Sequence, residues 1–233
     1  MTKFEFQVFQ GITPKEISHQ AWNKSGGKEA PGILQIIQQF NQITYWVATE
    51  VVSEKDLKKR VSIITHFINI AEHCKNIFNF NTMMEILVGL MLGPVQRLKA
   101  SWEAVPSSVL SSYKKLSSLI DNRKNYFNYR EALKSAKKSL ETVPTFPYVG
   151  LYLKDLTFIE DGNDNFLDKQ KNIINFEKMV MIANIFIDFQ TYQENLYLFE
   201  KLPHTSNWLQ NNKKIIKDDI QLFGLSKECE KNK

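Results

Sequence analysis

Residues 61–74, VSIITHFINIAEHC, decide the fold class of this chain. Their apolar residues recur at positions i, i+4, i+7, i+8 and i+11, the spacing of one face of an α-helix: Ile63, Phe67, Ile70, Ala71 and Cys74. A second stretch shows similar helical spacing through Leu34, Ile37, Asn41, Thr44 and Tyr45. Both stretches predict helices whose marked faces meet a core.

Glycine and proline separate the helical stretches, and strand-type patterning is weak throughout. Alternation of apolar and polar residues is rare, and the 9 glycines are few for a series of tight hairpins. Residues 107–142 are consistent with two more helices, and no long linker or fixed-period repeat divides the chain. Residues 1–233 are therefore expected to form one compact all-α domain of several helices, with a frayed polar end after about Leu225.

Composition and charge exclude several classes of protein. The 233 residues include 30 Lys and Arg against 25 Asp and Glu, and the densest basic group, at 213–217, lies beside two aspartates as on a solvated helix face. We therefore expect no nucleic-acid partner. The longest apolar run, Ile86 to Val95, has about half of the ~20 residues that a membrane span needs. Two distant cysteines and the lack of an apolar leader favour a cytoplasmic protein.

The chain offers no set of side chains suited to bond-making catalysis. His66 and His73 lie about two helical turns apart, too far to share a zinc ion without a third segment, so no metal site is expected. Neither of the common glycine-rich phosphate-binding motifs occurs. Gly89 and Gly93 have a spacing that, outside a membrane, indicates close helix packing. These features favour a module that binds another macromolecule.

The segment 174–193, INFEKMVMIANIFIDFQTYQ, predicts a helix that is apolar on two opposite sides. One side is expected to meet the core: Phe176, Met179, Val180, Ala183 and Ile187. The opposite side presents Met181, Ile185, Asp188 and Tyr192. Periodicity leaves two alternatives for the aspartate: an internal donor pairs with it in a central helix, or it stays hydrated on an exposed stripe until a partner supplies a donor.

Several blocks of the chain resemble the catalytic domain of guanine-nucleotide exchange factors for Ras-family small GTPases. They occur in the family's order between about residues 4 and 208, with residues 213–233 as a C-terminal extension: FEFQVFQGITPKEISHQAW, FNQITYWVATEVV, FINIAEHCKNIFNFNTMMEILVGL, GPVQRLKASWEAVP, NYREALKS, VPTFPYVGLYLKDLTFIEDGN and INFEKMVMIANIFIDFQTYQ. The resemblance implies an all-helical domain with a protruding helical hairpin.

The resemblance also implies a role for the first helix of that hairpin. In the family this helix moves the switch I region of the GTPase away from the nucleotide, with an apolar side chain toward the magnesium site and an acidic one where a phosphate lay. Carried over to this sequence, the acidic position falls on Asp188 and the apolar one on Ile185, with Asn184 and Met181 beside them. The family often has Glu at the acidic position, which is one methylene longer than Asp188.

A second surface resembles the family's cradle for switch II. The matching blocks place Arg97, Lys99, Tyr152 and Asp155 there, with Tyr192 as a further contact to the GTPase. Internal salt bridges and helix caps are the alternative role for these side chains. Asn81, Glu103 and Phe176 match positions that support the hairpin and the core.

The function implied is acceleration of GDP release from a Ras- or Rap-like GTPase, without covalent chemistry. No cofactor is expected on this chain, because GDP, GTP and Mg²⁺ would be bound by the partner, which would also be the route to a membrane surface. An inactive GTPase-binding or scaffolding module of the same fold is the alternative. It is favoured by the shorter acid and by the absence, before Phe4, of the N-terminal helical motif that usually braces the hairpin.

Overall fold

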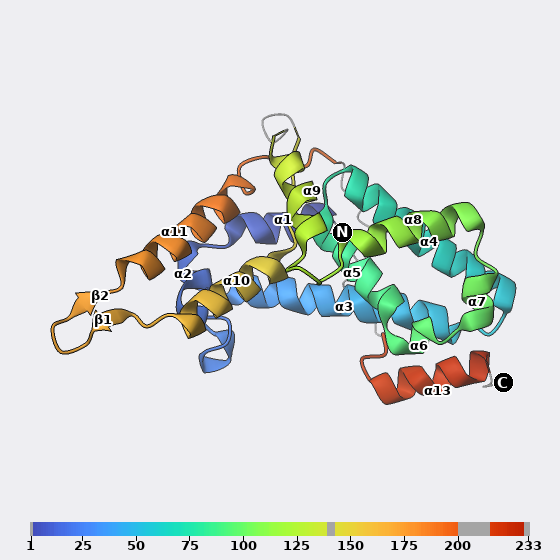
Figure 1. The fold of residues 1–233 in the computed structure, drawn as a ribbon. Helices are drawn as coiled ribbons and strands as arrows, with labels where there is room; N and C mark the ends of the chain where they lie inside the picture. Colours follow the sequence, from blue (N-terminus) through green and yellow to red (C-terminus); the bar gives the residue numbers. More distant parts are fainter. Residues whose placement is uncertain (1, 139–142, 200–214, 231–233) are drawn as a thin grey trace.

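The computed structural model describes residues 2–138, 143–199 and 215–230 (Figure 1). These residues form a mostly helical domain with one small antiparallel sheet, which confirms the predicted fold class. No helix in the described ranges is long and apolar enough to cross a bilayer. The first half of the chain contains α1 (Thr2–Gly11), α2 (Pro14–Ile17), η1 (Ser18–Gln20), η2 (Ser25–Gly27), α3 (Pro31–Ser53), α4 (Leu57–Asn76), α5 (Phe80–Met91), α6 (Gly93–Gln96), α7 (Lys99–Glu103) and α8 (Ser107–Leu119).

The second half forms an arm at one end of the domain and a last helix at the other (Figure 1). Its elements are α9 (Phe127–Lys137), α10 (Val149–Gly162), β1 (Phe166–Asp168), β2 (Ile173–Ile174), α11 (Phe176–Thr191) and α13 (Asp219–Cys229). We call α10, the β1–β2 hairpin and α11 the arm. Its strands lie at the left-hand tip in Figure 1, away from α13. The second helix of the expected hairpin would follow α11, where residues 200–214 lie outside the described ranges.

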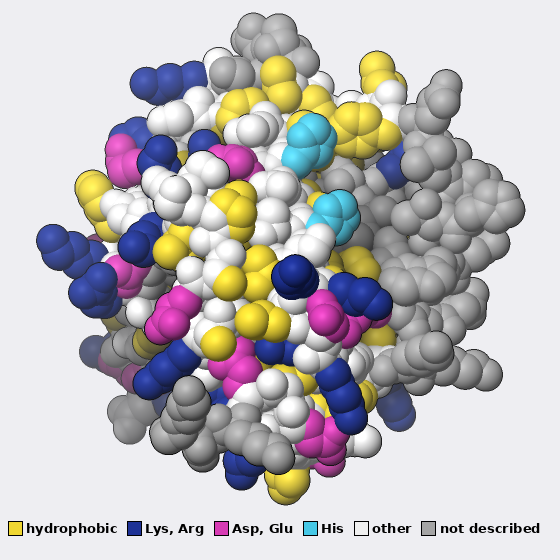
Figure 2. All heavy atoms as spheres, turned by 90° about the vertical axis from the view of Figure 1, so that its right-hand side faces the viewer, with side chains coloured by type: hydrophobic (Ala, Val, Ile, Leu, Met, Phe, Trp, Pro, Cys, Tyr) yellow, Lys and Arg dark blue, Asp and Glu magenta, His cyan; other side chains and the backbone are white. Residues whose placement is uncertain are grey.

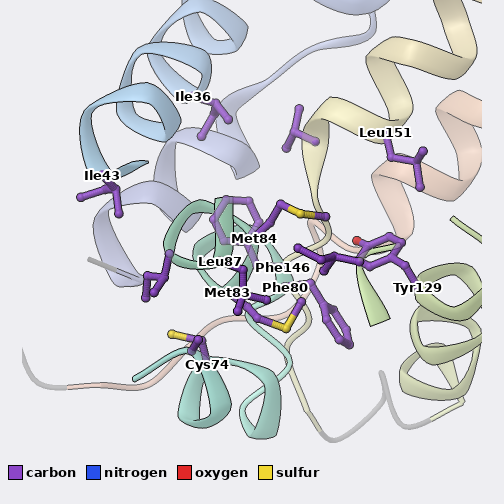
Figure 3. Packing of buried hydrophobic residues seen from close by; sticks show 14 of the residues in the cluster. Ile36, Ile43, Cys74, Phe80, Met83, Met84, Leu87, Tyr129, Phe146 and Leu151 are labelled. Atoms are coloured by element: carbon purple, nitrogen blue, oxygen red, sulfur yellow. The ribbon is translucent and has the colours of Figure 1, made fainter. Parts of the chain in front are cut away.

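The core is built around α5, which packs against α3 and α4. Figure 3 shows α5 side chains such as Met83 and Leu87 at its centre, with Cys74 of α4 beside them. At Gly89 the expected close packing is present, since a Cβ there would lie 2.6 Å from the carbonyl oxygen of Thr44 on α3. A side chain at this position would therefore push the two helices apart.

The faces predicted for the two opening stretches differ in outcome. In α4, Phe67, Ala71 and Cys74 are buried as expected. In α3, Thr44 is buried as expected and Ile37 and Tyr45 are half-buried against the core, whereas Asn41 is exposed and the other buried residues are Ile33, Ile36, Ile43, Val47, Ala48, Thr49, Val51 and Val52. The prediction for α3 is correct only in part because this helix contacts α1, α4, α5 and α13, so that its buried residues do not form one stripe.

The predicted fraying after Leu225 is wrong, because α13 continues to Cys229 and is anchored beyond it. The Glu230 carboxylate accepts hydrogen bonds from the backbone N–H groups of Ala100 and Ser101 at 3.0 and 2.9 Å. It also lies 3.4 Å from the buried guanidinium of Arg60. Burial raises the pKa of Glu230, but the hydrogen bonds from Ser101 and Ala100 outweigh it and hold this pKa below its ordinary value.

Two carboxyl groups, Glu5 on α1 and Glu85 on α5, are buried in the core. Thr82 donates a hydrogen bond of 2.9 Å to Glu5, and Asn81 donates one of 2.8 Å to Glu85. The second oxygens, Glu5 Oε1 and Glu85 Oε2, have no hydrogen-bond partner among the described residues. Desolvation raises the pKa of both groups. The charge of Glu5 raises the pKa of Glu85 further. At least one of the two therefore carries its proton more readily in the folded than in the unfolded chain.

We expect Glu85→Gln to stabilise the domain at neutral pH. A carboxyl whose pKa is raised by folding contributes stability below its unfolded pKa and loses it as the pH rises through the folded pKa. An amide avoids this loss, so the variant should gain about 1–3 kcal/mol at pH 7.5 and nothing at pH 4. Urea unfolding at both pH values tests this, with the exposed Glu103→Gln as control. An equal change in the free energy of unfolding at the two pH values would contradict the explanation from a buried carboxyl group.

Candidate functional site

The base of the arm is fixed to α1 by an amide and by aromatic rings. Gln193 Nε2, just after α11, donates hydrogen bonds of 2.7 and 2.9 Å to the carbonyl oxygens of Phe9 and Ile12. The Phe189 ring lies 4.9 Å from that of Phe9 and 5.3 Å from that of Tyr152 on α10. Because these contacts hold the last turn of α11, its direction relative to the core is set at this end.

Near the tip, α11 is held to α10 by a buried lysine. Lys178 Nζ forms an ion pair of 2.8 Å with Glu160, and their side chains are only 2% and 11% exposed. The same nitrogen donates to the carbonyl oxygen of Asn163 at 2.8 Å and to Asn165 Oδ1 at 2.7 Å. The end of α10 thus supplies the acceptors that a buried ammonium group requires.

The structure buries a different side of α11 from the one predicted to meet the core. Its buried residues are Lys178, Ile182 and Phe189, followed by Tyr192 at the cap. The side expected to meet the core is largely exposed, with Phe176 at 73% and Ile187 at 63%. The prediction failed because Lys178 reads as a surface residue in a hydropathy pattern, whereas its ion pair makes it the first buried position. Phe176 accordingly lies on the surface and not in the core.

Asp188 is paired and partly exposed at once, so each of the two alternatives left open by the sequence is realised in part. Lys137 Nζ, at the end of α9, lies 2.5 Å from Asp188 Oδ1, and the two side chains are 40% and 38% exposed. Tyr152 Oη donates a hydrogen bond of 2.7 Å to Asp188 Oδ2. Asp188 thus has the internal donors of the first alternative and the exposure of the second, and the group remains accessible.

The tyrosines beside Asp188 act as neutral hydrogen-bonding groups. Burial first, and the negative charge of Asp188 second, raise the pKa of Tyr152 and of Tyr192 well above the ordinary value. Tyr152 consequently keeps its proton and donates a hydrogen bond to Asp188 throughout the neutral range. The Lys137 ammonium also lies 5.7 Å from the centre of the Tyr192 ring, a cation–π distance.

These groups line a pocket of about 430 Å³ between α9, α10 and α11. Six of the predicted site residues lie on its wall: Tyr152, Asp155, Asn184, Ile185, Asp188 and Tyr192. Ile185 and Leu151 give it apolar wall, while Arg130, Lys134 and Lys137 bring positive charge. Asp155 is not free there, since both of its oxygens accept 2.8 Å hydrogen bonds from Arg130 Nη2. Met181 is 37% exposed on α11 and does not line the pocket.

The other predicted residues lie elsewhere. Arg97 and Lys99 belong to the end of the domain that carries α6, α7 and α13, far from the arm (Figure 1). Arg97 Nη1 donates a 2.7 Å hydrogen bond to the carbonyl oxygen of Ser226 on α13, an internal role of the kind weighed as its alternative. Lys99 and Glu103 are exposed, so the expectation that Glu103 supports the core is wrong.

Asn81 lies at the root of the arm. It is 1% exposed, and its Oδ1 accepts a 3.4 Å hydrogen bond from the backbone N–H of Val149, the first residue of α10. Its Nδ2 group donates to Glu85. The side chain thus links α5 to the first turn of the arm.

Sequence reasoning missed Lys137, Arg130 and Lys178, three of the basic residues that pair with acids of the arm. Lys137 precedes Asp188 by 51 residues, and Arg130 precedes Asp155 by 25. No local spacing connects such pairs. Only the mixed charge of residues 127–137 hinted that this helix carries ion pairs.

Charges of both signs are mixed on one face of the described part of the molecule. Figure 2 shows the right-hand end of the molecule, where Lys and Arg side chains are interspersed with Asp and Glu. No group of His, Cys, Asp and Glu within the described ranges is arranged to hold a metal ion. Fold and site together define a helical interaction domain that presents a carboxylate beside apolar side chains on a projecting arm.

Comparison with known proteins assigns this domain to a family. The family model of the RasGEF domain matches residues 1–180, and the chain belongs to this family, as its ordered blocks predict. It is similar to three proteins of Dictyostelium discoideum: Ras guanine nucleotide exchange factor M (36% identical over 99% of this chain), factor Q (38% over 97%) and factor Y (40% over 90%). The chain covers 24%, 17% and 14% of these relatives' own lengths, so it matches only one part of each.

Proposed function

We propose that this domain accelerates the release of GDP from a Ras- or Rap-like small GTPase. The observation that carries the proposal is Asp188, a partly exposed carboxylate on the arm of a RasGEF-family domain, next to Ile185 and to exposed apolar side chains of α11. The names of the similar Dictyostelium proteins, all Ras guanine nucleotide exchange factors, support the choice of partner. Nucleotide and Mg²⁺ belong to the GTPase in this proposal.

The proposed mechanism is differential binding without bond formation. By linkage, a surface that binds the nucleotide-free GTPase more tightly than the loaded form must weaken nucleotide binding by the same factor. Asp188 would take the place of a phosphate group, and Ile185 would occupy space near the magnesium site. Each tenfold increase in the release rate requires about 1.4 kcal/mol of relief at the transition state.

Fluorescent-GDP release from a panel of Ras, Rap and more distant small GTPases tests the proposal. We expect the domain at micromolar concentration to accelerate release by about tenfold or more from at least one Ras- or Rap-like member. Heat-denatured domain at equal concentration is the control for non-specific effects. Unchanged release from every GTPase on the panel would contradict exchange activity.

A GTPase-binding module without exchange activity is the second candidate, and one observation favours it. Lys137 neutralises the carboxylate that exchange would use. This candidate predicts equal affinity for nucleotide-free and GDP-loaded GTPase, with no acceleration of release. Pull-down of both GTPase forms in the panel experiment separates the two candidates.

A further inference from the structure

Lys137 and Tyr152 hold Asp188 in different ways. Lys137 is the last residue of α9, and its ammonium group lies 2.5 Å from Asp188 Oδ1. Tyr152, whose pKa is raised by burial and by Asp188, donates a neutral hydrogen bond to Oδ2 and leaves the carboxylate charge in place. Lys137 supplies a full positive charge and cancels it. Only the lysine therefore changes what Asp188 can offer to a binding partner.

The other cations around the pocket are arranged differently. Arg130 Nη2 donates hydrogen bonds to both carboxylate oxygens of Asp155, so Arg130 is paired with Asp155 and not with Asp188. Lys134 lines the pocket and is exposed. Of the basic residues on this wall, Lys137 is the one in ion-pair contact with Asp188.

The Lys137–Asp188 pair is placed where it can open. The two side chains are 40% and 38% exposed, and pairs of such exposure contribute little to stability because water screens them and both side chains lose freedom. The Tyr152 hydrogen bond and the burial of Tyr192 would keep α11 in place when Lys137 swings away. Opening would thus expose the charge of Asp188 without moving the helix.

We propose that Lys137 is a positioning residue that restrains Asp188 in the free domain and slows exchange until a partner displaces it. The inference rests on the proposed function, since it concerns the acid assigned to exchange. Displacement requires a partner group that competes for the carboxylate, such as a hydroxyl or N–H donor at the nucleotide site of the GTPase. Lys137 in turn becomes free to meet an acidic group of that partner.

The test is GDP release from a responsive GTPase by Lys137→Met and Lys137→Arg variants. Lys137→Met removes the charge but keeps a stem of similar length, and should accelerate release by about two- to fivefold, the range expected for an exposed ion pair. Lys137→Arg keeps the charge and should behave as the parent. Lys55→Met is the matched control, since it breaks another exposed pair, Lys55–Glu228 at 3.0 Å, at the α13 end of the domain.

A double-mutant cycle separates restraint of Asp188 from a general effect on folding or surface charge. In an Asp188→Asn background, Lys137→Met should leave the release rate unchanged. Acceleration of equal size in both backgrounds would overturn the proposal, as would a Lys137→Met variant that is no faster than an active parent. If parent and Lys137→Met are both inactive on the whole panel, the proposed function and the restraint fail together, whereas activity of Lys137→Met alone supports both.

Discussion

Replacing Lys178 by Met is expected to destabilise the domain by about 3–5 kcal/mol. The substitution removes an ammonium group that is 2% exposed and leaves Glu160 without its 2.8 Å ion pair. The carbonyl oxygen of Asn163 and the side-chain oxygen of Asn165 lose their donor as well. Glu160, whose side chain is only 11% exposed, would keep just the contact with His19 at 3.3 Å, so this loss is expected to be far larger than that of a surface pair. Chemical unfolding gives the free energy, and hydrogen exchange along α10 and α11 locates the change.

Two further variants make this prediction specific. Lys171→Met in the same arm breaks an exposed pair with Asp168 and should change stability by less than about 1 kcal/mol. Adding Glu160→Gln to Lys178→Met should recover part of the loss, because it removes a negative charge that has lost its buried ammonium partner. Similar stability of Lys178→Met and Lys171→Met would show that the buried pair does not hold the arm.

The helical elements were largely predictable, but the side that each helix buries was predictable only where one face meets one neighbour. The stretch 61–74 gave the correct face, since α4 buries Phe67, Ala71 and Cys74 on one side. In α3, contacts with several neighbouring helices bury residues on more than one side of the helix, so no single apolar face marks them. In α11, a buried lysine occupies a core position. Hydropathy assigns charge to the surface, so it cannot find a salt bridge that is made between distant segments.

The candidate site shows the same division. The resemblance selected Tyr152, Asn184, Ile185 and Asp188, and these lie around one pocket. It could not supply their partners, because Lys137 meets Asp188 only after α9 and α11 have packed beside α10. The prediction for Arg97 placed it on the same GTPase-binding surface as Tyr152, whereas its guanidinium contacts α13 at the far end.

The second large effect is expected at Asp188 itself. Asp188→Asn keeps the size of the side chain but removes the charge, and should slow GDP release by about 10- to 100-fold. This range reaches the lower end of the rate losses caused by removing one preorganised polar group from a catalytic site. Ile185→Ala should lower the rate less, because it removes volume and no charge. Glu228→Gln is the matched control, since it neutralises the acid of an exposed ion pair on α13.

The affinity of parent and Asp188→Asn domains for nucleotide-free and GDP-loaded GTPase, measured side by side by calorimetry, tests the central claim most directly. The proposed mechanism predicts that the parent prefers the nucleotide-free form, and that Asp188→Asn shows a smaller preference while keeping its affinity for the loaded form. An undiminished preference in Asp188→Asn would contradict the claim that the carboxylate of α11 takes the place of a phosphate group.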